Sequence, residues 1–105
     1  MIRVEYDAPA LRLWVEGHAQ SGPPGQDLVC AAVSGLTVTL AEALRQMESQ
    51  GRGAAELRIG SGSAFLAFRP EAEHQKEARI RMDTVFLGLR LLGEKFPRNM
   101  KVIAE

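Results

Sequence analysis

The sequence predicts an α+β fold, a two-layer sandwich in which two helices pack on one face of an antiparallel or mixed sheet. Two observations support this class. Residues 2–15 and 57–68 each alternate apolar and polar residues on both sides of a turn, as β-hairpins do. Residues 27–50 and 72–96 carry apolar residues at helical spacing. The predicted order is therefore ββαββα, with a short last strand in "MKVIAE" giving ββαββα(β).

Composition predicts one soluble domain that spans residues 1–105, because no repeat, low-complexity segment or long linker divides the chain. Thirteen basic and thirteen acidic residues give zero formal net charge, which argues against direct nucleic-acid binding. The N-terminal residues alternate and carry charges, which predicts neither a signal peptide nor a membrane span. A single cysteine cannot form an internal disulfide, and thiols persist best in a reducing compartment. We therefore expect a cytoplasmic protein that does not bind a membrane.

The first hairpin is predicted over residues 2–6 and 11–15, with "DAPA" as its turn. The second joins residues 57–59 to residues 64–68 through "GSGS". Nothing beside these glycines matches a phosphate-binding loop, so "GSGS" is interpreted as a hairpin turn.

The first helix is expected to begin with Asp27 as its N-cap, which makes Cys30 the third helical residue. One apolar stripe, roughly 80° wide, faces the sheet and consists of Val29, Val33, Leu36, Leu40, Leu44 and Met47. Asp27, Cys30 and Ser34 form a second, narrower stripe about 110° away. Cys30 is therefore predicted at the edge of the core, in the first turn of a helix.

The position of Cys30 has chemical consequences. The N–H groups of a first helical turn and a neighbouring imidazolium both stabilise a thiolate, which is the nucleophilic form of cysteine. His18 precedes Cys30 by a short loop that contains "GPPG", so the loop can return the chain and bring imidazole to thiol. The first-turn N–H groups could also hold a developing oxyanion.

These residues leave alternatives open. Cys30 and His18 are either a nucleophile and its base or two ordinary residues beside a turn. Asp27 either orients His18 or only caps the helix, and Ser34 either contacts the site or bonds back to its own helix. No metal site is predicted, because His18, Cys30 and His74 offer at most three ligands without the close pairing usual for zinc. His74 lies among charged residues and is expected to be solvated.

The segment "GHA", then seven residues, then "DLVCAAVSGL" resembles the signature of the bacterial ribosomal-processing cysteine protease family. The resemblance implies that His18 is the catalytic base and Cys30 the nucleophile, with Asp27 and Ser34 as polar residues of the same motif. The other positions that match are Gly17, Gly25, Val29 and Val33.

The resemblance also implies a function. Members of this family remove a short N-terminal extension from a protein of the large ribosomal subunit, without a cofactor. The loop beside the site differs in two ways: Ser21 stands where members often carry an aromatic residue, and prolines follow Gly22 and precede Gly25. A stiffer loop would change access or peptide preference. The alternative from another class is a non-catalytic ribosome-associated or assembly factor with the same fold.

The second helix carries two apolar stripes. The stripe expected to cover the sheet consists of Ala78, Met82, Val85, Leu89, Leu92 and Phe96. Ile80, Leu87 and Leu91 lie on nearly the opposite side of the helix, where a two-layer domain offers no internal partner. Either a neighbouring loop or the C-terminal tail covers them, or they form the contact of a two-fold dimer. The family resemblance implies a homodimer as well.

Overall fold

The structure is a computed structural model that describes residues 1–18 and 27–104. Its elements follow the order β1 (Ile2–Asp7), β2 (Arg12–Glu16), α1 (Leu28–Ser49), β3 (Gly53–Gly60), β4 (Ser63–Pro70), the 3₁₀ turn η1 (Ala72–His74), α2 (Gln75–Lys95) and β5 (Met100–Ala104). This order confirms the predicted ββαββα(β) arrangement and the α+β class.

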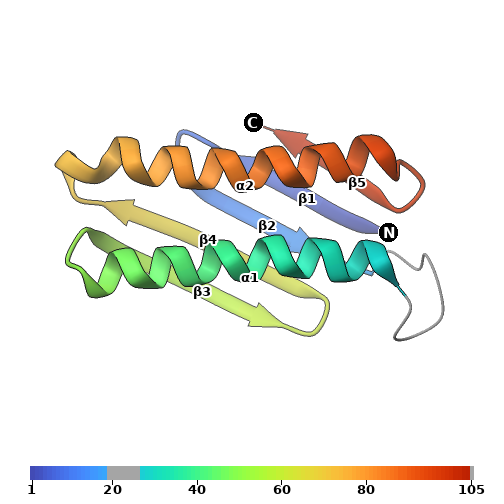
Figure 1. Cartoon of the computed structure of the whole chain (residues 1–105), viewed down its shortest axis with the longest axis horizontal. Helices are drawn as coiled ribbons and strands as arrows, with labels where there is room; N and C mark the ends of the chain where they lie inside the picture. Colours follow the sequence, from blue (N-terminus) through green and yellow to red (C-terminus); the bar gives the residue numbers. More distant parts are fainter. Residues whose placement is uncertain (19–26, 105) are drawn as a thin grey trace.

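The strands form a mixed sheet in the order β3-β4-β2-β1-β5. The pairs β1–β2, β2–β4 and β3–β4 are antiparallel, whereas β5 pairs with β1 in parallel. Figure 1 shows α1 and α2 side by side and antiparallel on the same face of the sheet. One face of the sheet is thus covered by helices, and the two hairpins are joined through β2 and β4.

The core lies between the sheet and the helices. Alternate residues of the strands point into it, and the strand residues that it buries are Ile2, Val4, Tyr6, Leu13, Val15, Ala64, Leu66, Phe68 and Met100. The predicted stripe of α1 is buried except for Leu36, which is half-buried and reaches toward Gly88 of α2. Thr37 is buried in addition, and its hydroxyl donates to the Val33 carbonyl of its own helix over 2.8 Å.

The length and composition of α1 would also allow it to cross a membrane, since it has 22 residues and a mean hydropathy of 1.5. The fold explains that apolar character in another way. One stripe of the helix, from Val29 to Met47, is buried against the sheet and α2. A core helix of a small domain meets the same criteria of length and hydropathy.

The elements differ from the predicted boundaries in two places. The first turn of the expected second helix is the 3₁₀ turn η1, and α2 begins only at Gln75. The second hairpin is longer than predicted, because β3 begins at Gly53 rather than at residue 57 and β4 continues to Pro70. Residues 53–55 are small and do not alternate, so the sequence pattern did not mark them as strand.

The outer stripe of α2 lies in solvent. Ile80, Leu87 and Leu91 are 55%, 43% and 53% exposed. Within residues 1–18 and 27–104, neither a loop nor the C-terminal strand covers them.

Candidate functional site

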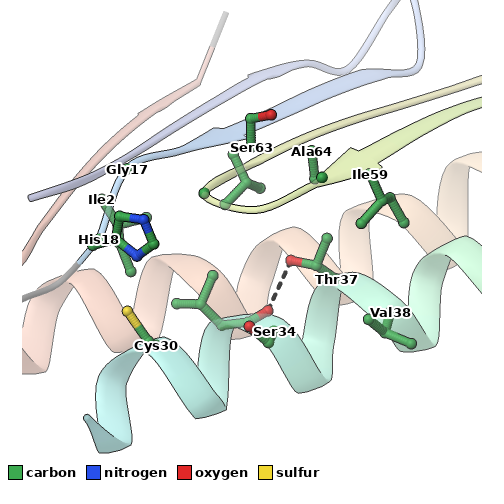
Figure 2. A pocket seen from close by; sticks show the side chains of 14 residues that line it. Ile2, Gly17, His18, Cys30, Ser34, Thr37, Val38, Ile59, Ser63 and Ala64 are labelled. Carbon is green, nitrogen blue, oxygen red and sulfur yellow. Dashed lines mark hydrogen bonds between the residues drawn. The ribbon is translucent and has the colours of Figure 1, made fainter. Parts of the chain in front are cut away.

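A pocket of about 150 Å³ opens where the N-terminal half of α1 passes the end of β2 and the β3–β4 hairpin. Its walls are formed by Ile2, Val15, Gly17, His18, Cys30, Val33, Ser34, Thr37, Val38, Ile59, Gly60, Gly62, Ser63 and Ala64. Figure 2 shows His18 and Cys30 at one end of this pocket and Val38 and Ile59 toward the other. The pocket therefore brings together segments from both hairpins and the first helix.

Two features of α1 place Cys30: the rotation of the helix about its axis and the residue at which the helix begins. Val29 and Val33 are 3% and 4% exposed and fix which side of the helix faces the sheet. Asp27 fixes where the helix begins, because its carboxylate accepts a hydrogen bond of 2.9 Å from the Cys30 backbone N–H. Cys30 consequently lies at the margin of the core, half-buried, in the first turn. This is the location that the sequence predicts.

His18 is placed by the residue before it. Gly17 follows β2 with φ +98°, a conformation that suits glycine, and a side chain there would collide with the Met1 carbonyl oxygen. The Gly17 N–H donates to the Gly62 carbonyl in the turn of the β3–β4 hairpin over 2.8 Å. The backbone is thus held on two sides immediately before the imidazole.

Figure 2 shows the Cys30 thiol directed toward the side of the pocket on which the His18 ring lies. Both side chains are accessible, since His18 is exposed and Cys30 is half-buried. The structure therefore brings together the two residues that the sequence singled out.

The supporting residues have distinct places. Ser34 is exposed and lines the pocket one turn beyond Cys30. Asp27 caps α1, which is one of the two roles that the sequence allows for it. That cap engages the Cys30 N–H, while the Ala31 N–H donates to the Asp27 carbonyl. In this conformation both of these N–H groups are bonded to Asp27.

Residues Ser21, Gly22 and Gly25 of the predicted site loop lie outside the described residues. His74 is far from the pocket in the fold: it belongs to η1, and its Nδ1 lies 3.5 Å from a Glu77 carboxylate oxygen. Across residues 1–18 and 27–104 no group of three His, Cys, Asp or Glu side chains is placed to hold a metal ion.

The second hairpin contributes pocket residues that the sequence analysis did not place there. Ile59, Gly62 and Ser63 line the wall opposite α1. Their role depends on the pairing of β4 with β2, in which Glu16 stands opposite Ser63. Nothing local in "GSGS" indicates that pairing, so only the turn itself could be predicted.

Comparison with known proteins gives a consistent result. The family model described as cysteine protease Prp matches residues 1–101. No curated protein sequence matches the chain.

Among solved structures, the fold is similar to the essential ribosomal processing protease Prp from S. aureus with a covalently linked product peptide. The TM-score is 0.79 at 19% identity, with all of both chains covered. The S. aureus protease with a substrate peptide gives a TM-score of 0.71 at 20% identity, again over both whole chains. SMU.848 from Streptococcus mutans gives 0.68 at 21% identity, covering 98% of this chain and 90% of that one.

The capping geometry generates a test of Asp27. We expect Asp27→Ala to lower the free energy of unfolding by about 1 kcal/mol, because the Cys30 N–H loses its acceptor. Asp27→Asn should retain most of that stability, since asparagine caps as well as aspartate. Urea denaturation of the three proteins measures both effects. Equal destabilisation by the two substitutions would mean that the carboxylate charge, rather than the cap, is what α1 requires.

Proposed function

Because the chain belongs to the family of the cysteine protease Prp, we propose that it is a cysteine endopeptidase with Cys30 as nucleophile and His18 as general base. The observation that carries this proposal is the placement of the Cys30 thiol and the His18 ring at the same end of one pocket. A thiolate in the first turn of a helix is stabilised by the helix dipole and by a neighbouring imidazolium.

The proposed reaction proceeds in two stages. His18 takes the thiol proton, the Cys30 sulfur attacks the scissile carbonyl carbon, and the tetrahedral intermediate collapses to a thioester as His18 gives its proton to the leaving amine. Water then attacks the thioester with His18 accepting its proton, the carboxylic product departs, and the thiol is restored. Acyl transfer of this kind uses only these two side chains and water, so the proposal includes neither a metal nor a cofactor.

The rest of the pocket fits a peptide with apolar side chains. Val38 and Ile59 are 56% and 50% exposed and line the pocket beyond the His18–Cys30 end. Exposed aliphatic residues facing one cavity from two elements are a common feature of ligand-binding surfaces.

For the substrate we propose the N-terminal extension of a large-subunit ribosomal protein. The support is the family membership together with the similar S. aureus structures, whose protein is a ribosomal processing protease seen with substrate and product peptides. We also propose that the protein acts in the cytoplasm, a reducing compartment in which a free thiol persists. The zero net charge of the chain favours recognition of the protein substrate itself rather than of RNA.

The first test addresses the nucleophile. Iodoacetamide should add one group to the protein, because Cys30 is its only cysteine, and should abolish cleavage of a peptide that spans the extension. Cys30→Ala and Cys30→Ser should be inactive and yet remain within about 1 kcal/mol of the original stability, since the side chain is small and only half-buried. Mass spectrometry of the peptide and urea denaturation measure the two outcomes. A Cys30→Ala protein that still cleaves would exclude this mechanism.

The second test addresses the base. His18→Ala should lower kcat by roughly a hundredfold or more, the usual contribution of a positioned general base. It should also slow alkylation of Cys30 at neutral pH, because an imidazolium beside the sulfur favours the reactive thiolate. The rates are measured by quenching the alkylation at set times over a range of pH and analysing the protein by mass spectrometry. Superimposable rate profiles for the two proteins would show that His18 does not act on Cys30.

We also propose that the protein is a homodimer whose two copies meet through the outer face of α2. The support is the exposure of Ile80, Leu87 and Leu91 along one side of that helix. Each copy would present the same apolar stripe to the other, as a two-fold interface requires.

Substitution on this stripe tests the dimer. At micromolar concentration the original protein should scatter light as a dimer, and Leu87→Glu combined with Leu91→Glu should be monomeric, because burying four carboxylates in one interface is unfavourable. Leu87→Met with Leu91→Met keeps the surface apolar and is the matched control, which should stay dimeric. A monomeric mass for the original protein at high concentration would refute the proposal.

A further inference from the structure

The turn of the β3–β4 hairpin lies directly against the His18 ring. At Gly62, which has φ +75°, an added Cβ would stand 2.8 Å from His18 Nε2, 3.4 Å from Cε1 and 3.5 Å from Cδ2. Ordinary van der Waals contact begins at 3.4 Å. The imidazole therefore occupies space that any side chain at this turn position would take.

The backbone around this contact is held in place. The Gly17 N–H donates to the carbonyl of Gly62 itself, so the turn and the residue before His18 cannot move apart without losing a hydrogen bond of 2.8 Å. On the other side, Gly17 lies against the Met1 carbonyl. A side chain at Gly62 would consequently displace the imidazole ring rather than the strand that carries it.

We propose that Gly62 is a positioning residue for His18: its missing side chain lets the ring rest on the hairpin turn, on the side of the pocket where Cys30 lies. The ring is the end of a flexible side chain, so it would yield by at least about 0.6 Å, the difference between 2.8 Å and 3.4 Å. A misplacement of about 1 Å can reduce catalysis by roughly a hundredfold. The catalytic meaning of this contact rests on the proposed function.

The chain offers a matched control for backbone strain. Gly51 has the same φ of +75°, lies in the turn that follows α1 at the end far from Cys30, and has nothing within 4 Å of an added Cβ. Alanine at either glycine must adopt the left-handed conformation that disfavours a side chain. Only alanine at position 62 also meets the imidazole.

The experiment compares Gly62→Ala and Gly51→Ala in three measurements: urea denaturation, kcat and KM for the peptide, and the rate of Cys30 alkylation against pH. We expect both variants to lose similar stability. Gly62→Ala should in addition lose at least tenfold in kcat with KM changed less than threefold, and its alkylation profile should move toward that of His18→Ala. Gly51→Ala should keep the kcat and the profile of the original protein. Gly62→Asn provides a second variant, because asparagine tolerates a positive φ while still carrying a Cβ.

The result that overturns the inference is a Gly62→Ala or Gly62→Asn protein with the kcat and alkylation profile of Gly51→Ala. Failure of the proposed function has a different signature. If the original protein cleaves no peptide, the alkylation profiles still report whether a Cβ at position 62 weakens the action of His18 on Cys30. If His18→Ala leaves the alkylation profile of Cys30 unchanged, both the pairing of His18 with Cys30 and the positioning role of Gly62 are wrong.

Discussion

The hydrogen bond from the Gly17 N–H to the Gly62 carbonyl is the contact on which the position of His18 in the pocket depends. It continues the β2–β4 ladder one step past the last paired residues, Glu16 and Ser63. Strand ends fray readily, and this bond keeps the two chain segments together where the imidazole begins. A single hydrogen bond contributes only about 1 kcal/mol to stability, so its importance here is geometric rather than energetic.

The thiol is placed by a different kind of interaction. Burial of Val29 and Val33 sets the rotation of α1 about its axis, and the Asp27 cap sets its first residue. Because successive residues are about 100° apart, starting the apolar stripe one residue earlier or later would turn Cys30 into the core or out of the pocket. His18 and Cys30 are therefore positioned independently, one by a strand ladder and one by helix packing. They line the same pocket because α1 packs on the sheet to which β2 belongs.

The features that could be predicted from the sequence are those that depend on local signals, and the features that could not be predicted depend on contacts between distant segments. The start of α1 at Asp27, its buried stripe and the location of Cys30 follow from capping and periodicity, which are local signals. The pairing of β4 with β2, the parallel addition of β5 and the turn of Leu36 toward α2 depend on contacts between distant segments. The contact of Gly62 with His18 belongs to this second group. A hairpin turn could be predicted from "GSGS", whereas the residue that lies against it could not.

The length of α1 that lines the pocket can be compared with the length of an extended peptide. Cys30, Ser34 and Val38 follow one another at intervals of four residues along the side of α1 that lines the pocket. Eight residues of helix rise about 12 Å, a distance that an extended peptide covers in roughly three to four residues. Under the proposed reaction, the scissile carbonyl of a peptide lying along this wall would be at Cys30. A side chain three to four residues from that carbonyl would then lie near Val38 and Ile59, where an apolar side chain fits. Under the proposed function, the apolar end of this wall would select the peptide side chain, and the end that carries His18 and Cys30 would perform the chemistry.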